Sequence, residues 1–113
     1  MEIKQILVGI GCPVERPPYK FDDKTRQFVT YQLISETGDL FVEDDNDVER
    51  VLMSVDVYSR TDWRELVKII KRRLKAADYS IISVGPELYE PDTKFYHIPL
   101  RVETIDAIDE DMD

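Results

Sequence analysis

Two side chains of this sequence are of the types that nucleophilic catalysis uses: the thiol of Cys12 and the imidazole of His97, each the only residue of its kind. A neighbouring imidazole lowers the pKa of a thiol, but nothing in the sequence brings these two residues together. A lone cysteine usually behaves as a small buried hydrophobe. A structural zinc site needs about four Cys or His ligands, which this chain does not have. We therefore predict no enzyme, no catalytic residue, no metal and no cofactor.

One acidic segment is rich enough in oxygen atoms to be weighed as a calcium site. It contains Asp44, Asp45, Asn46, Asp47 and Glu49. The segment lacks the central glycine and the distal glutamate of an EF-hand loop. We interpret it as a solvated loop, because runs of like charge are usually exposed.

A second acidic group faintly resembles the metal-dependent nucleases, in which carboxylates hold magnesium and a lysine assists. It consists of Asp92, Thr93 and Lys94 with Asp78 upstream. Pro91 favours a turn at this point instead. The four glycines form neither a phosphate loop nor a dinucleotide-binding fingerprint. The turn is the preferred interpretation.

The strongest functional signal is the charge of residues 61–77. This stretch has six bases and two acids, a net +4, so the rest of the chain carries −13 within a total of −9. Three interpretations stay open: a solvated face, a docking surface for an acidic neighbour such as a second copy, and a nucleic-acid patch that uses Lys68, Lys71, Arg72 and Lys75. The acidity of the whole chain disfavours the last, because phosphate neutralisation drives nucleic-acid affinity.

Length and composition indicate one globular domain. The chain has 113 residues, of which 42% are apolar and 35% charged. No stretch approaches the roughly 18 consecutive apolar residues of a membrane span, and the first ten residues do not resemble a secretion signal. A lone thiol is easiest to maintain in a reducing cytosol. We expect a soluble protein made in the cytosol, with no membrane contact.

Periodicity predicts an α+β domain over residues 1–103 with the element order α-β-β-α-β-β. Apolar residues at helical spacing over 3–10 predict a short opening helix, and prolines then predict an extended connection through Tyr19. Next come a strand over 26–35 and a turn at 36–39 with a hairpin return at 40–42. A strand over 51–58 then leads into a helix over 62–77, and strands over 80–84 and 95–102 follow. Acid-rich residues 104–113 predict a disordered tail.

The helix over 62–77 is the best defined element. Thr61 or Asp62 is its predicted N-cap, and Glu65 completes a capping box with Asp62. Its apolar stripe predicts packing on one face of an antiparallel or mixed sheet of four or five strands. The stripe consists of Trp63, Leu66, Val67, Ile70, Leu74 and Ala77. Pro99 lacks an N–H donor, so the last strand is predicted to lie at a sheet edge or to leave one side of its hydrogen bonding free.

Several segments together resemble a known family. They are Cys12-Pro13-Val14 with the proline-rich link after it, Phe28 to Ile34, Val55 to Ser59 leading into the Trp63 helix, Gly85 to Glu90, and Tyr96 to Val102. Over residues 1–103 the chain resembles the small tail-completion proteins (tail terminators, head–tail joining proteins) of long-tailed bacteriophages and prophages, and more distantly the minor tail protein U type.

The resemblance implies a structural protein that forms a ring, commonly a hexamer, in the host cytoplasm and then in the virion. Such a ring caps the tail tube, contacts the head connector and lets DNA pass without binding it specifically. We expect subunit contacts at sheet edges and in the 36–50 loop. By charge, the predicted contact residues are Arg64, Lys68, Arg72, Asp44, Asp45 and Asp47. The alternative is a small nucleic-acid-binding regulator that uses the basic helix face.

Overall fold

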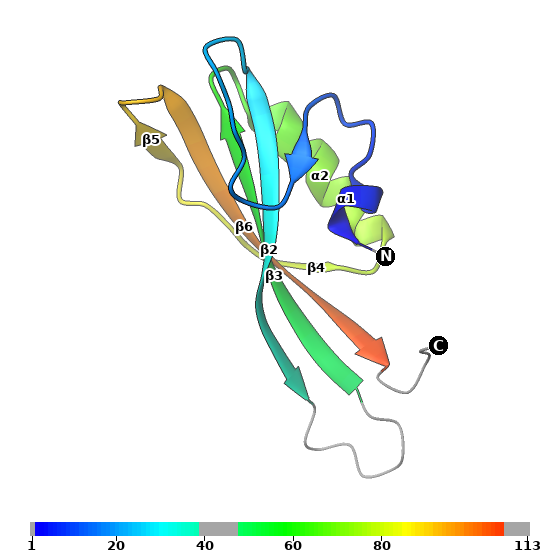
Figure 1. The fold of residues 1–113 in the computed structure, drawn as a ribbon. Coiled ribbons are helices and arrows are strands. Elements are labelled where there is room, and N and C mark those ends of the chain that lie inside the picture. Colours follow the sequence, from blue (N-terminus) through cyan, green and yellow to red (C-terminus); the bar gives the residue numbers. More distant parts are fainter. Residues whose placement is uncertain (1, 39–47, 108–113) are drawn as a thin grey trace.

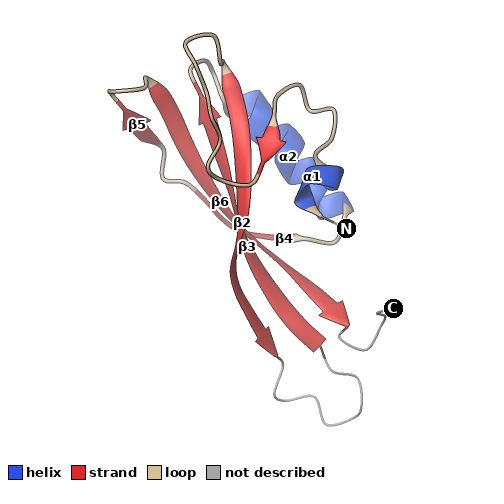
Figure 2. Cartoon of the chain, in the orientation of Figure 1, coloured by secondary structure: helices blue, strands red, loops and turns tan. Residues whose placement is uncertain are grey.

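The computed structural model describes residues 2–38 and 48–107, and shows a small α+β fold with a mixed sheet and two helices on one of its faces (Figures 1 and 2). The elements are α1 (Ile3–Ile6), β1 (Val14–Glu15), β2 (Gln27–Gly38), β3 (Val48–Ser59), α2 (Arg64–Ala76), β4 (Ser80–Val84), β5 (Leu88–Glu90) and β6 (Phe95–Ala107).

The sheet has the strand order β1-β2-β3-β6-β4, and β5 also pairs with β6. β1 runs parallel to β2, and all other pairs are antiparallel. The predicted α+β class is therefore confirmed, with six strands among the described residues where four or five were expected. β1 and β5 were missed because two- and three-residue strands give no readable periodicity.

The long strands pass beyond the helices at one end of the molecule (Figure 1). β2 continues to Gly38, so the predicted turn over 36–39 is wrong for residues 36–38. β3 and β6 are also longer than predicted, and Thr104 to Ala107 pair with Val48 to Val51. The predicted tail therefore begins four residues too early, and residues 108–113 lie outside the described part. The hairpin return at 40–42 lies outside it as well.

The core lies between α2 and the facing side of the sheet. Strand alternation puts Val29, Val55 and Leu100 on this side, and each is fully buried. The predicted helical stripe is confirmed: Leu66, Val67, Ile70 and Leu74 are buried, while Trp63 and Ala77 pack at its two ends. Burying each such aliphatic side chain contributes roughly 1.5–3 kcal/mol.

The start of α2 differs from the prediction by one residue. The N-cap is Trp63, and neither Thr61 nor Asp62 occupies that position. Asp62 still satisfies one free donor of the first turn, because its Oδ1 accepts a hydrogen bond from the backbone N–H of Arg64 at 3.0 Å. The capping box predicted between Asp62 and Glu65 is thus replaced by a side-chain cap from the residue before the N-cap.

Pro99 does not mark an edge strand, because β6 lies between β3 and the pair β4 and β5. Its carbonyl accepts a hydrogen bond from the N–H of Gly85 at 2.7 Å. The N and C=O of one residue in an antiparallel strand point to the same side. The nitrogen of Pro99 therefore faces the gap between the end of β4 at Val84 and the start of β5 at Leu88. A proline is tolerated there because no ladder bond requires its missing N–H.

Candidate docking surface

Four bases of α2 gather on its outer side, away from the sheet. Lys68, Lys71, Arg72 and Lys75 line one shallow hollow of about 260 Å³. Helical spacing of three and four residues puts them next to one another. Within the described ranges, none of the four takes part in an ion pair or a side-chain hydrogen bond. Lys68 and Arg72, two of the predicted contact residues, are therefore together and available to a partner.

Arg73 belongs to the same basic run but holds the fold together. Its Nη1 donates hydrogen bonds to the carbonyl oxygens of Ile6 at 3.0 Å and Val8 at 2.8 Å. These carbonyls lie at the end of α1, where a helix leaves acceptors unpaired. Arg73 thus attaches α1 to α2, and only part of the positive charge of residues 61–77 faces outward.

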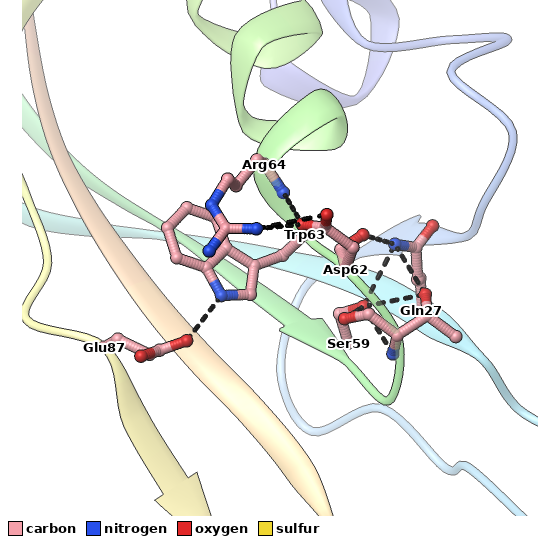
Figure 3. Close-up of polar contacts among 7 residues, drawn as sticks. Gln27, Ser59, Asp62, Trp63, Arg64 and Glu87 are labelled. Atoms are coloured by element: carbon pink, nitrogen blue, oxygen red, sulfur yellow. Dashed lines mark hydrogen bonds and ion pairs between the residues drawn. The ribbon is translucent and has the colours of Figure 1, made fainter.

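Arg64 lies at the start of α2 (Figure 3), where it lines a different hollow. Its guanidinium makes an ion pair with Asp62 at 3.1 Å and lies over the Trp63 ring at 5.8 Å. The indole N–H of Trp63 donates a hydrogen bond to Glu87 at 2.7 Å. Arg64 lines this hollow of about 250 Å³ and does not line the hollow of the other four bases, so the structure does not bring all predicted basic contact residues into one surface.

The acidic half of the predicted contact lies elsewhere. Asp44, Asp45 and Asp47 are outside the described residues, as is most of the 36–50 loop. The part of that segment which is described belongs to β2 and β3. A contact between these acids and the basic hollow therefore stays a prediction.

Cys12 and His97 lie on opposite sides of the sheet. Cys12 packs against the core on the helix side, while His97 stacks on Tyr58 on the other face at 4.3 Å. Burial raises the pKa of the Cys12 thiol to about 11, so it is almost entirely protonated near neutral pH. The thiol therefore has neither the partner nor the ionisation that a nucleophile needs.

The nuclease-like residues are also far apart. Asp92 to Lys94 form the turn before β6, whereas Asp78 lies near the other end of β6, where its carbonyl accepts a hydrogen bond from Thr104 at 3.4 Å. Thr104 lies nine residues after Phe95 along β6, a distance of roughly 30 Å. The predicted turn over 91–94 is confirmed. Within the described ranges, no group of three or more His, Cys, Asp or Glu side chains is arranged to hold a metal.

One polar cluster was missed by the sequence analysis. His97 Nε2 lies 2.9 Å from Asp56 Oδ1, and the Ser54 hydroxyl donates to Asp56 Oδ2 at 2.9 Å. Glu90 lies 3.9 Å from the other ring nitrogen of His97. The serine contacts the acid and not the imidazole, so the order of contacts differs from that of a catalytic triad. The alternation of Asp56 with buried valines was the available signal, since an acid on a strand face needs a partner.

Comparisons with known proteins add no family: no family model matches the sequence, and no curated protein matches it. Among the described residues, neither helix has the length and apolar character needed to cross a bilayer.

Proposed function

We propose that this chain is a non-enzymatic structural protein of a bacteriophage or prophage, which forms an oligomeric ring, caps the tail tube and joins the tail to the head. The resemblance of several segments within residues 1–103 to the tail-completion proteins supports this role. The observation that supports self-assembly is a sheet that ends on two different sides in strands whose outer edges no other described strand covers. Closed rings need two unlike contact surfaces on each subunit.

Charge supports the same role. The outward bases of α2 belong to a chain of net charge −9, so each copy presents a positive surface to acidic neighbours. Such complementarity steers association and sets orientation more than it adds affinity. Lys68 and Arg72, with Arg64 nearby, would meet acidic segments of a second copy, of the tail tube protein or of the head connector. An acidic ring lumen suits DNA that passes without specific binding.

A gene deletion with biochemical complementation tests the role. Removing the gene from the producing bacterium should leave heads and tails unjoined, which negative-stain electron microscopy detects. Adding purified wild-type protein to that lysate should restore joined particles and plaque-forming titre. Normal virions from the deletion strain would refute the proposal.

Charge reversal on α2 tests the basic hollow. Lys68→Glu combined with Arg72→Glu should lower the restored titre at least about tenfold, because like charges then face the acidic partner. Lys20→Glu combined with Lys24→Glu is the matched control, since both lysines are exposed and lie away from α2. Equal loss in both double variants would show that net charge matters and the hollow does not.

A nucleic-acid-binding regulator is the second candidate, favoured by the four bases around one hollow. About four phosphate contacts predict that affinity falls on the order of 100-fold between 50 and 200 mM salt. A filter-binding titration of duplex DNA and of RNA measures this. Tight binding with that salt dependence, lost in the Lys68→Glu/Arg72→Glu variant, would favour the regulator over the assembly role.

A further inference from the structure

The outer edges of β2 and β4 each have a stretch that no other described strand covers, and cross-strand pairing places the two stretches level with each other. β1 pairs only with Val29 and Thr30, so no described strand covers β2 from Gln32 onward. On the opposite side, no described strand covers the outer edge of β4. Rows of paired residues connect the two edges across the sheet: Val84–Leu100–Val55–Tyr31, Ser83–Arg101–Ser54–Gln32, Ile81–Val102–Met53–Leu33 and Ser80–Glu103–Leu52–Ser35.

β4 and residues 31–35, the part of the open β2 edge that cross-strand pairing places level with β4, lack charge and proline. β4 has the sequence Ser-Ile-Ile-Ser-Val, and residues 31–35 of β2 have the sequence Tyr-Gln-Leu-Ile-Ser. Soluble proteins usually protect an edge strand with charged side chains, because its free N–H and C=O groups accept another strand. Other parts of the described edges contain acids: Glu15 in β1, Glu36 further along β2 and Glu90 in β5.

Each of the two stretches also exposes an isoleucine at a β-bulge. Ile34 is the extra residue where β2 pairs with β3, and its exposed fraction is 39%. Ile82 is the extra residue where β4 pairs with β6, and its exposed fraction is 54%. A bulge leaves its extra residue unpaired and re-aims its side chain, which is why these two isoleucines are exposed at the edges. The apolar side chains would gain burial if a second strand covered them.

The strand directions are compatible with a cyclic arrangement of copies. The steps from β2 to β3, from β3 to β6 and from β6 to β4 are all antiparallel, so β4 runs opposite to β2. A second copy in the same orientation therefore presents its β2 antiparallel to β4 and at the matching height. The contact joins two unlike edges, and such a contact forms a ring when the rotation between successive copies closes.

We propose that β4 of one copy pairs with residues 31–35 of β2 in the next copy, so that the sheet continues from subunit to subunit. This contact rests on the ring-forming role proposed above and assigns the two edges that form it. Backbone hydrogen bonds supply the affinity, as in other strand additions, and Ile34 and Ile82 become covered. A second copy is the occupant because its open β2 stretch matches β4 in direction, height and lack of charge.

Single lysine substitutions on each edge, followed by mixing, test the contact. Ile82→Lys should block β4 and Ile34→Lys should block β2, so each variant alone should be monomeric where the wild-type chain forms higher oligomers. In an equal mixture, the intact β2 of the Ile82→Lys variant can pair with the intact β4 of the Ile34→Lys variant. The mixture should therefore give a dimer and no larger oligomer. Light scattering after size exclusion measures all three masses. Ile105→Lys, a change of the same type at a position with an exposed fraction of 59%, is the control and should assemble normally.

The outcomes separate this contact from the proposed function. Normal oligomers from both single variants would overturn the edge contact and leave ring formation standing through another surface. Monomeric variants whose mixture also stays monomeric would overturn it too, as would a wild-type chain that is monomeric up to about 1 mM. The titre restored in the deletion lysate reports on tail joining independently of these masses.

Discussion

The two faces of the central strands are buried in different ways. The helix side is aliphatic, and α2 covers it with Leu66, Val67, Ile70 and Leu74. No helix among residues 2–38 and 48–107 covers the other side, where aromatic rings stack across neighbouring strands. Phe28 stacks on Tyr58 at 4.5 Å, and Tyr58 stacks on His97 at 4.3 Å. The stacked rings therefore cover part of this sheet face in place of a helix.

The loop before β2 and one arginine complete this second face. Tyr19 stacks on Phe28 at 4.7 Å, and Phe21 meets Phe95 edge to face at 5.0 Å. The Arg60 guanidinium lies 4.1 Å from the Phe95 ring centre and donates hydrogen bonds to three backbone carbonyls, those of Asp22, Thr25 and Thr93. The two faces are thus both covered by side chains, whereas the sheet edges and the outer bases of α2 have no partner among the described residues.

The largest expected effect tests whether the second face is a true core. Phe95 is fully buried, so Phe95→Ala should lower the free energy of unfolding by about 4 kcal/mol, as cavity formation does in a helix-covered core. Leu100→Ala on the helix side is the reference, with an expected loss of about 3 kcal/mol. Urea denaturation followed by circular dichroism measures both. A loss below about 1 kcal/mol for Phe95→Ala would mean that the second face is loosely packed.

Sequence reasoning predicted the helix side well and the other side poorly. The period of 3.6 in α2 and the alternation of Val55 and Val57 in β3 depend on local burial, which a single sequence displays. The ring stack depends on Phe28, Tyr58 and His97 meeting at one register, which is a long-range property. No local pattern shows that three strands will align in this way.

The candidate docking surface shows the same division between local patterns, which the sequence displays, and long-range contacts, which it does not. Helical spacing alone put Lys68 and Arg72 together. It did not show that Arg73 would bind the carbonyls of α1, because that contact joins residues more than sixty positions apart. Of the two alternatives predicted for Pro99, the edge strand is wrong, because β6 lies inside the sheet, whereas the free side of hydrogen bonding agrees with the gap between β4 and β5 that its nitrogen faces.

The next effect concerns the polar contacts within the second face. Asp56→Ala removes the acceptor of both Ser54 and His97 in a largely buried position, so we expect a loss of about 2 kcal/mol in unfolding free energy. A double-mutant cycle with His97→Ala should give a coupling of about 1 kcal/mol between the two side chains. Additive losses would mean that the 2.9 Å contact does not stabilise the fold, and the rings alone hold this face.

The smallest effect at neutral pH is expected for Tyr58→Phe, which keeps the ring stack and removes only the hydroxyl. The unfolding free energy should change by no more than about 0.5 kcal/mol near pH 7. The two proteins should then diverge at alkaline pH. Burial, with smaller contributions from Asp56 and Glu90, raises the pKa of Tyr58 from 10.0 to about 12.

A raised pKa means that the folded state favours the protonated hydroxyl. This contribution is fully present below about pH 10 and is lost as the pH rises towards 12, because the unfolded chain ionises first. Tyr58→Phe has no hydroxyl to ionise, so its stability does not fall in this way. The variant should therefore become the more stable protein near pH 11. Cys12 also titrates in this range, but it is present in both proteins and cancels in the difference. Parallel stability curves from pH 7 to 11 would show that water reaches the Tyr58 hydroxyl, and that the second face is open where the helix side is closed.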